Sequence, residues 1–119
     1  MRTIDQKLAH EAYSRVVTRK TQPDFDFGKY SSVALSFPAL IHSCGLTQAL
    51  AYAEAKGYDN YIDDLQSVFS VVDVDEDLAR LSRNAELDVY TRISRHALTA
   101  SSWIKRYCQA MNSGGENFA

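Results

Sequence analysis

The stretch of residues 87–111 most constrains how this chain can fold, because it is the longest uninterrupted helical pattern in the sequence. At about 100° per residue, its apolar side chains recur at spacings of three and four and therefore share one side of a helix. This apolar stripe comprises Tyr90, Ile93, Ala97, Ala100, Ile104, Tyr107, Cys108 and Met111. A buried stripe of this length needs partners, so the sequence predicts that the rest of the chain supplies helices to cover it.

The opposite side of the same predicted helix is cationic and polar. It carries Arg92, Arg95, Thr99, Ser102 and Arg106, with Lys105 at one margin and Trp103 at the other. Because the apolar side is the one that is covered, we expect this cationic side to remain in water, where it is available to an anionic partner.

The other segments also follow helical patterns. We expect helices over residues 3–20, 29–44, 46–56, 60–72 and 78–83, because no stretch shows the alternating β-branched pattern of a strand or the Asn-Gly turn of a hairpin. A chain of 119 residues can bury a real core as one domain. The predicted fold is all-α, a compact single-domain bundle of about six helices over residues 1–112 that ends in one long helix. Residues 113–119 are expected to form a frayed tail.

Several residues mark where these helices begin and end. Thr3 and Gln6 fit the S/T-x-x-E/Q pattern of a capping box, and Asp59 is expected to cap the helix that begins at residue 60. Gly45 is expected to end a helix with a positive φ. Pro38 lies inside the second predicted helix, and because the apolar periodicity continues across it we expect a kink rather than two helices.

From the sequence we expect neither a membrane segment nor an export signal. No apolar run approaches the roughly 20 residues of a membrane span, and the N-terminus is charged where a signal peptide would be apolar, so we expect a cytoplasmic protein. Cys44 and Cys108 could pair, bind a metal or act as small core residues. Because they lack a CxxC spacing, the sequence favours two free, buried thiols.

The formal net charge of −2 conceals two regions of opposite sign. Residues 54–77 contain a single base, Lys56, whereas bases outnumber acids over residues 80–106. Such a distribution indicates either solvated helix faces with internal ion pairs or surfaces for charged partners. The acidic run at 73–77 resembles a calcium loop only superficially, because it lacks the glycine and the distant glutamate of an EF-hand. The run is better explained by the next helix, because acidic side chains stabilise the positive end of a helix dipole.

Residues with catalytic or metal-binding potential are scattered. His10, His42 and His96 lie in three separate predicted helices, and none belongs to an HExxH motif. Asp63 and Asp64 are adjacent, so their carboxylates diverge by about 100° on a helix, and we interpret both as surface residues. The sequence therefore favours a binding or scaffolding module without a metal, a cofactor or enzymatic activity.

Two segments together resemble a known family. The first contains Tyr30, then Phe37-Pro38-Ala39-Leu40-Ile41, then Gly45-Leu46-Thr47-Gln48-Ala49-Leu50-Ala51. The second contains Tyr90-Thr91-Arg92-Ile93-Ser94-Arg95-His96-Ala97-Leu98, followed by Trp103-Ile104-Lys105-Arg106-Tyr107. In order and spacing they are similar to the small helical subunit of the type III-B CRISPR effector, the Cmr complex, over most of residues 30–111. The chain departs from that family's pattern at Phe37, where leucine is expected, and at Ser36, where a base is common.

This resemblance implies a helical, non-catalytic subunit. Several copies would stack in the minor filament of the complex, contact its backbone subunit and help hold the duplex of guide RNA and target RNA. The second helix lacks the base that is common at the position of Ser36, so the last helix is the better candidate for RNA contact. Its candidate RNA-binding residues are Arg92, Arg95, Thr99, Ser102, Trp103, Lys105 and Arg106. Candidate contacts with neighbouring subunits are Asp73, Asp75, Glu76 and Asp77, together with Arg15, Arg19 and Lys20.

Two other classes of function remain open from the sequence. A helical adaptor that binds only protein would use the same cationic face to meet an acidic partner or to stay soluble. An enzyme of unknown type is the third possibility.

Overall fold

The computed structural model describes residues 2–112, which form six helices and no strand. The helices are α1 (Ile4–Thr21), α2 (Phe27–Cys44), α3 (Leu46–Ala55), α4 (Asp59–Phe69), α5 (Leu78–Asn84) and α6 (Leu87–Asn112). The prediction of an all-α fold that ends in one long helix is confirmed. The predicted tail at 113–119 lies outside the described residues.

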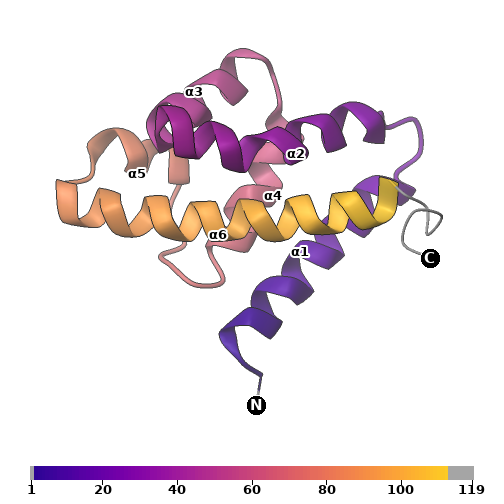
Figure 1. Cartoon of the computed structure of the whole chain (residues 1–119), viewed down its shortest axis with the longest axis horizontal. Coiled ribbons are helices and arrows are strands. Elements are labelled where there is room, and N and C mark those ends of the chain that lie inside the picture. The colour runs from indigo at the N-terminus through magenta and orange to yellow at the C-terminus, as the bar shows by residue number, and fades with distance from the viewer. Residues whose placement is uncertain (1, 113–119) are drawn as a thin grey trace.

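The long helix α6 organises the other elements. Figure 1 shows α6 running across the molecule, with α2 along one side of it and α1 crossing behind it. Helix α6 contacts α1, α2, α4 and α5. Its buried residues are Ile93, Ala97, Ala100, Ser101, Ile104 and Cys108. The predicted stripe is therefore confirmed at its centre, whereas Tyr90, Tyr107 and Met111 are only partly buried beside the core.

The signals at the helix ends are confirmed in part. The Thr3 hydroxyl accepts from the Gln6 amide at 3.1 Å, and the Gln6 side chain accepts from the Thr3 amide at 2.8 Å, which completes the capping box. Gly45 has a φ of +86°, as predicted. Asp59 is not a cap: it is the first residue of α4, Tyr58 occupies the cap position, and no side chain there bonds to the helix start.

Helix α4 spans Asp59–Phe69, so it ends three residues before the predicted boundary at residue 72. Its buried residues are Tyr61, Asp64, Leu65, Val68 and Phe69. The assignment of Asp64 to the surface is therefore wrong, since its exposed fraction is 0%. Asp64 follows Tyr61 by three residues and precedes Val68 by four, so helical geometry carries it inward with its apolar neighbours.

The two cysteines differ in environment. Both are free, but only Cys108 is buried, so the prediction of two buried thiols is wrong for Cys44, the exposed last residue of α2. Burial raises the pKa of the Cys108 thiol to about 12. Pro38 lies within the single continuous helix α2, so the chain does not form two helices at that point.

Candidate nucleic-acid interface

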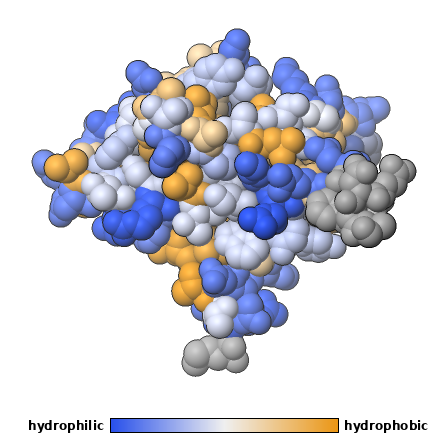
Figure 2. All heavy atoms as spheres, viewed as in Figure 1, coloured by the Kyte–Doolittle hydropathy of each residue, from blue (hydrophilic) through white to orange (hydrophobic). Residues whose placement is uncertain are grey.

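The outward face of α6 is exposed from Arg95 to Arg106. Arg95, Thr99, Ser102 and Arg106 are exposed, while Trp103 and Lys105 at the two margins are partly buried. Figure 2 shows hydrophilic side chains spread along the band that α6 occupies in Figure 1. From residue 89 to residue 112 the helix contains no Asp or Glu.

The free cations of this face are Arg95, Lys105 and Arg106. Within residues 2–112, no carboxylate lies within salt-bridge distance of any of these three side chains. Their positive charges are therefore not neutralised inside the subunit. An anion can therefore bind to this face without breaking an existing ion pair of these cations.

Arg92 belongs to the same helix but is held by the loop between α4 and α5. Its Nε and Nη2 atoms donate to the Asp73 carboxylate at 3.1 Å and 3.0 Å. Nδ1 of His96 lies 2.6 Å from the same carboxylate, whose side chain is only 3% exposed. The partner of Arg92 is Asp73, which is itself a predicted contact for a neighbouring subunit.

The pKa of Asp73 shows which influences dominate around this carboxylate. Burial alone would raise the pKa, but hydrogen bonds from Arg92, the Val74 amide and His96 outweigh burial and lower it to about 2. Asp73 is therefore charged at neutral pH, and it fixes the loop to α6.

The two hydroxyls on the outward face point their hydrogens at their own helix. Thr99 donates to the Arg95 carbonyl at 3.1 Å, and Ser102 donates to the Leu98 carbonyl at 2.9 Å. In this conformation neither hydroxyl is available as a hydrogen-bond donor to a phosphate. Their oxygen lone pairs still face outward and can accept.

Trp103 ends a row of three aromatic rings between α1 and α6. Its indole stacks on the Tyr107 ring, with centroids 6.2 Å apart and an angle of 22° between the planes. Tyr107 in turn meets Tyr13 edge to face at 5.4 Å. Trp103 also borders a shallow surface hollow on α6 that is lined by Leu98, Thr99, Ser102, Trp103 and Arg106.

The cationic residues of α1 have internal partners. Arg19 donates to both carboxylate oxygens of buried Asp64, at 2.9 Å and 3.0 Å. Arg15 pairs with Glu11 at 3.2 Å and lies 3.6 Å from Asp64. Lys20 lies over the Phe27 ring, 5.1 Å from its centroid. These contacts tie α1 to α4 and α2.

Asp64 is the centre of a buried network that sequence reasoning missed. Besides Arg19, it accepts a hydrogen bond from the Tyr30 hydroxyl at 2.5 Å. Burial and the negative charge of Asp64 both raise the pKa of Tyr30 above its usual value, and the hydrogen bond to Asp64 raises the pKa of Arg19. The signal in the sequence was the helical spacing of Asp64 with Tyr61, Leu65 and Val68.

The rest of the acidic run is exposed. Asp77 accepts from the Arg80 amide at 3.1 Å and caps α5, which confirms that this run marks a helix start. Asp75 accepts from the Ser70 hydroxyl at 3.2 Å, and the Glu76 carboxylate has no partner within residues 2–112. Val74 beside them is 42% exposed. An acidic loop with one exposed apolar side chain is therefore presented to the surroundings.

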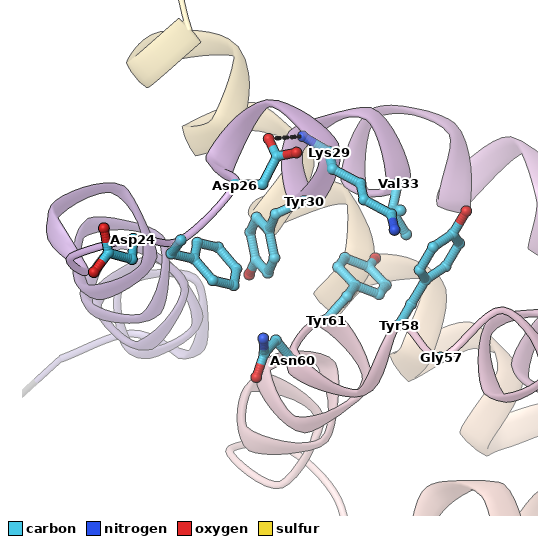
Figure 3. Close-up of a pocket in the computed structure, with 10 residues that line it drawn as sticks. Asp24, Asp26, Lys29, Tyr30, Val33, Gly57, Tyr58, Asn60 and Tyr61 are labelled. Atoms are coloured by element: carbon cyan, nitrogen blue, oxygen red, sulfur yellow. Dashed lines mark hydrogen bonds between the residues drawn. The ribbon is translucent and has the colours of Figure 1, made fainter.

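A second hollow lies between α2 and α4 (Figure 3). Figure 3 shows Tyr30 on one side of it and Tyr58 and Tyr61 on the other. Tyr30 and Tyr61 are only 5% and 1% exposed, so their rings offer almost no free surface. The Lys29 ammonium lies over the Tyr58 ring, 5.9 Å from its centroid. This hollow is therefore the outer edge of the aromatic core.

The described residues assemble no metal centre and no membrane helix. In residues 2–112, no group of three or more His, Cys, Asp or Glu side chains could hold a metal ion. None of the helices α1 to α6 combines the length and apolarity that a membrane crossing requires. Fold and surface together define a small all-helical protein with one cationic helix face and one exposed acidic loop.

Comparison with known proteins gives the family. The model of the family described as CRISPR-associated protein (Cas_Cmr5) matches residues 4–111. The chain is 38% identical over 114 residues to the "CRISPR system Cmr subunit Cmr5" of Thermus thermophilus, covering 93% of this chain and 97% of that protein. The chain belongs to the Cmr5 family of CRISPR-associated proteins.

A solved structure shares the fold. The crystal structure of a CRISPR-associated Cmr5 family protein from Thermus thermophilus superposes with a TM-score of 0.80 at 35% sequence identity. The match covers 92% of this chain and 97% of that one. The resemblance inferred from the two sequence segments is thus confirmed at the level of family and fold.

Proposed function

We propose that the chain is a non-catalytic subunit of a CRISPR Cmr complex, and that it contributes cationic contacts to RNA through the outward face of α6. Membership of the Cmr5 family supports the assembly, since the matched Thermus relative is named as a Cmr subunit. The observation that carries the RNA role is that Arg95, Lys105 and Arg106 are accessible and have no carboxylate partner within residues 2–112. Arginine suits this role because its planar fork donates two hydrogen bonds to a phosphate.

The contacts are to phosphate and sugar. Pairing between guide and target already reads the sequence in such complexes, so a subunit beside the duplex needs no base-specific contact there. Copies of the subunit stack in the minor filament, and the acidic loop around Asp75 and Glu76 meets a basic neighbour. Such a heterologous contact builds an open filament rather than a closed dimer.

The test compares two double variants of the assembled complex. Arg95→Ala with Arg106→Ala removes two free cations of α6, whereas the control Lys7→Ala with Arg80→Ala removes the same charge from exposed positions on α1 and α5. We expect the α6 variant to weaken binding about equally for all target sequences. The slope of log affinity against log salt should become shallower by up to about 0.7 to 0.9 for each phosphate that the variant no longer neutralises.

The same experiment distinguishes the protein-only adaptor. That alternative is favoured by Arg92, because its Nε and Nη2 atoms donate hydrogen bonds to Asp73 within the subunit. If the α6 variant and the control give the salt slope of the parent complex, then the cationic face serves solubility or protein contacts, and the RNA role is refuted.

A further inference from the structure

Trp103 is the only tryptophan in the chain, and it lies at the edge of the free cationic face. One side of its indole is occupied by Tyr107, which is itself held edge-on by Tyr13. The two tyrosines therefore fix the orientation of the indole before any ligand arrives. A ring held in this way loses little conformational freedom when another ring stacks on it.

Trp103 also lines the hollow on α6, whereas Tyr107 does not. Besides Trp103, the hollow is lined by the small residues Thr99 and Ser102 and by Leu98 and Arg106. Thr99 and Ser102 direct their hydroxyl hydrogens to helix carbonyls, so each presents an acceptor to the hollow. The hollow thus combines an aromatic wall, two acceptors and one free guanidinium.

These groups match the parts of one nucleotide. A base offers a flat face for the indole and N–H groups for the two acceptors, and its phosphate offers oxygens for Arg106. In a continuous duplex, both faces of each base are covered by its neighbours, so the indole finds no partner there.

We propose that the Trp103 hollow binds an unpaired nucleotide, and hence that α6 prefers RNA with an unpaired base to a continuous duplex. This inference rests on the proposed RNA role of α6 and adds the form of RNA that the face selects. It assigns base stacking to Trp103, whereas Arg95, Lys105 and Arg106 contact phosphate in any form of RNA.

The test uses the full chain and exploits the single tryptophan. Three probes are titrated: a short single-stranded RNA, the same RNA in a continuous duplex, and a backbone of equal length without bases. Stacking should quench the Trp103 fluorescence with the single strand, and neither the duplex nor the abasic backbone should quench it.

Affinities of the labelled probes for variants complete the test. Trp103→Leu should weaken single-strand binding about 5- to 150-fold, which is the range for loss of one stacked base, and leave duplex binding unchanged. Trp103→Phe, which keeps a ring, should recover part of the loss. The control Arg106→Ala should weaken all three probes, and circular dichroism confirms that each variant is helical.

The outcomes separate the two proposals. If no probe binds, this inference is overturned, and the RNA role is decided separately by the salt slope of the assembled complex. If all three probes bind equally and the tryptophan is not quenched, α6 contacts only phosphate, and the stacking role alone is overturned. A Trp103→Phe variant that binds the single strand no better than Trp103→Leu also overturns it.

Discussion

Replacing Asp73 by asparagine should destabilise the fold by an amount that depends on pH. The change keeps the size of the side chain but removes the charge that Arg92 and His96 contact at 3.0–3.1 Å and 2.6 Å. The pKa of Asp73 falls from 3.8 to about 2 in the folded protein. At about 1.36 kcal/mol for each pKa unit, this difference corresponds to roughly 2–3 kcal/mol of stability.

The sign follows from the direction of the shift. Because the folded pKa lies below the unfolded one, the folded state favours the charged carboxylate, and the stabilisation is fully present above about pH 4. It is lost as the pH falls through 4 towards about 2, where Asp73 becomes protonated in the folded state as well. The parent and Asp73→Asn should therefore differ in unfolding free energy by roughly 2–3 kcal/mol at neutral pH and converge at low pH.

Urea unfolding of both proteins at a series of pH values measures this difference. Asp75→Asn is the matched control, since Asp75 is exposed and its carboxylate makes one hydrogen bond of 3.2 Å to Ser70. The control should stay close to the parent at every pH. The reasoning is refuted if Asp73→Asn follows the parent in parallel from pH 7 to pH 2.

Three further predictions concern other parts of the chain. Gly45→Val places a β-branched residue at a φ of +86°, so thermal unfolding should show a loss of about 1–3 kcal/mol, and an unchanged midpoint would contradict this. Asp64→Leu leaves the Arg19 guanidinium without its buried carboxylate and should cost about 3–5 kcal/mol in urea unfolding, whereas Asp63→Leu at a more accessible position should be nearly neutral. The double variant Asp75→Lys with Glu76→Lys leaves the Asp77 cap of α5 intact and should lower the amount of this subunit in purified Cmr complex. An unchanged subunit stoichiometry would exclude a role of the acidic loop in assembly.

The helices could be predicted because each one carries local information about its own face. The spacing of Ile93, Ala97, Ala100 and Ile104 identifies the buried side of α6 without any knowledge of its partners. Thr3 with Gln6 and Gly45 are equally local, since each acts on the backbone within a few residues. Boundaries that depend on packing were less accurate: α4 ends at Phe69 because the chain turns there, although apolar residues continue to Val72.

The ion pairs could not be predicted, because they join residues that are distant in sequence. Arg92 and Asp73 are 19 positions apart, and Arg19 and Asp64 are 45 apart. Periodicity shows which side of a helix faces outward, but it does not show which loop returns to cover that side. The interpretation of Asp64 as a surface residue failed for the same reason, since a carboxylate is buried only where a cation from another helix meets it.

The arginines of this chain differ in function according to the carboxylates near them. Arg19 and Arg92 each donate two hydrogen bonds to a largely buried carboxylate, and removing either arginine would leave that carboxylate without its main cation. The main role of the charges of these two arginines is therefore to stabilise the fold. Arg95 and Arg106 have no such carboxylate within residues 2–112, so their loss should leave the fold intact and change only what the surface binds. A helix face that looks uniformly cationic in sequence is thus divided by Asp73 into a structural end at Arg92 and a binding end from Arg95 to Arg106, and RNA-binding assays should show that division residue by residue.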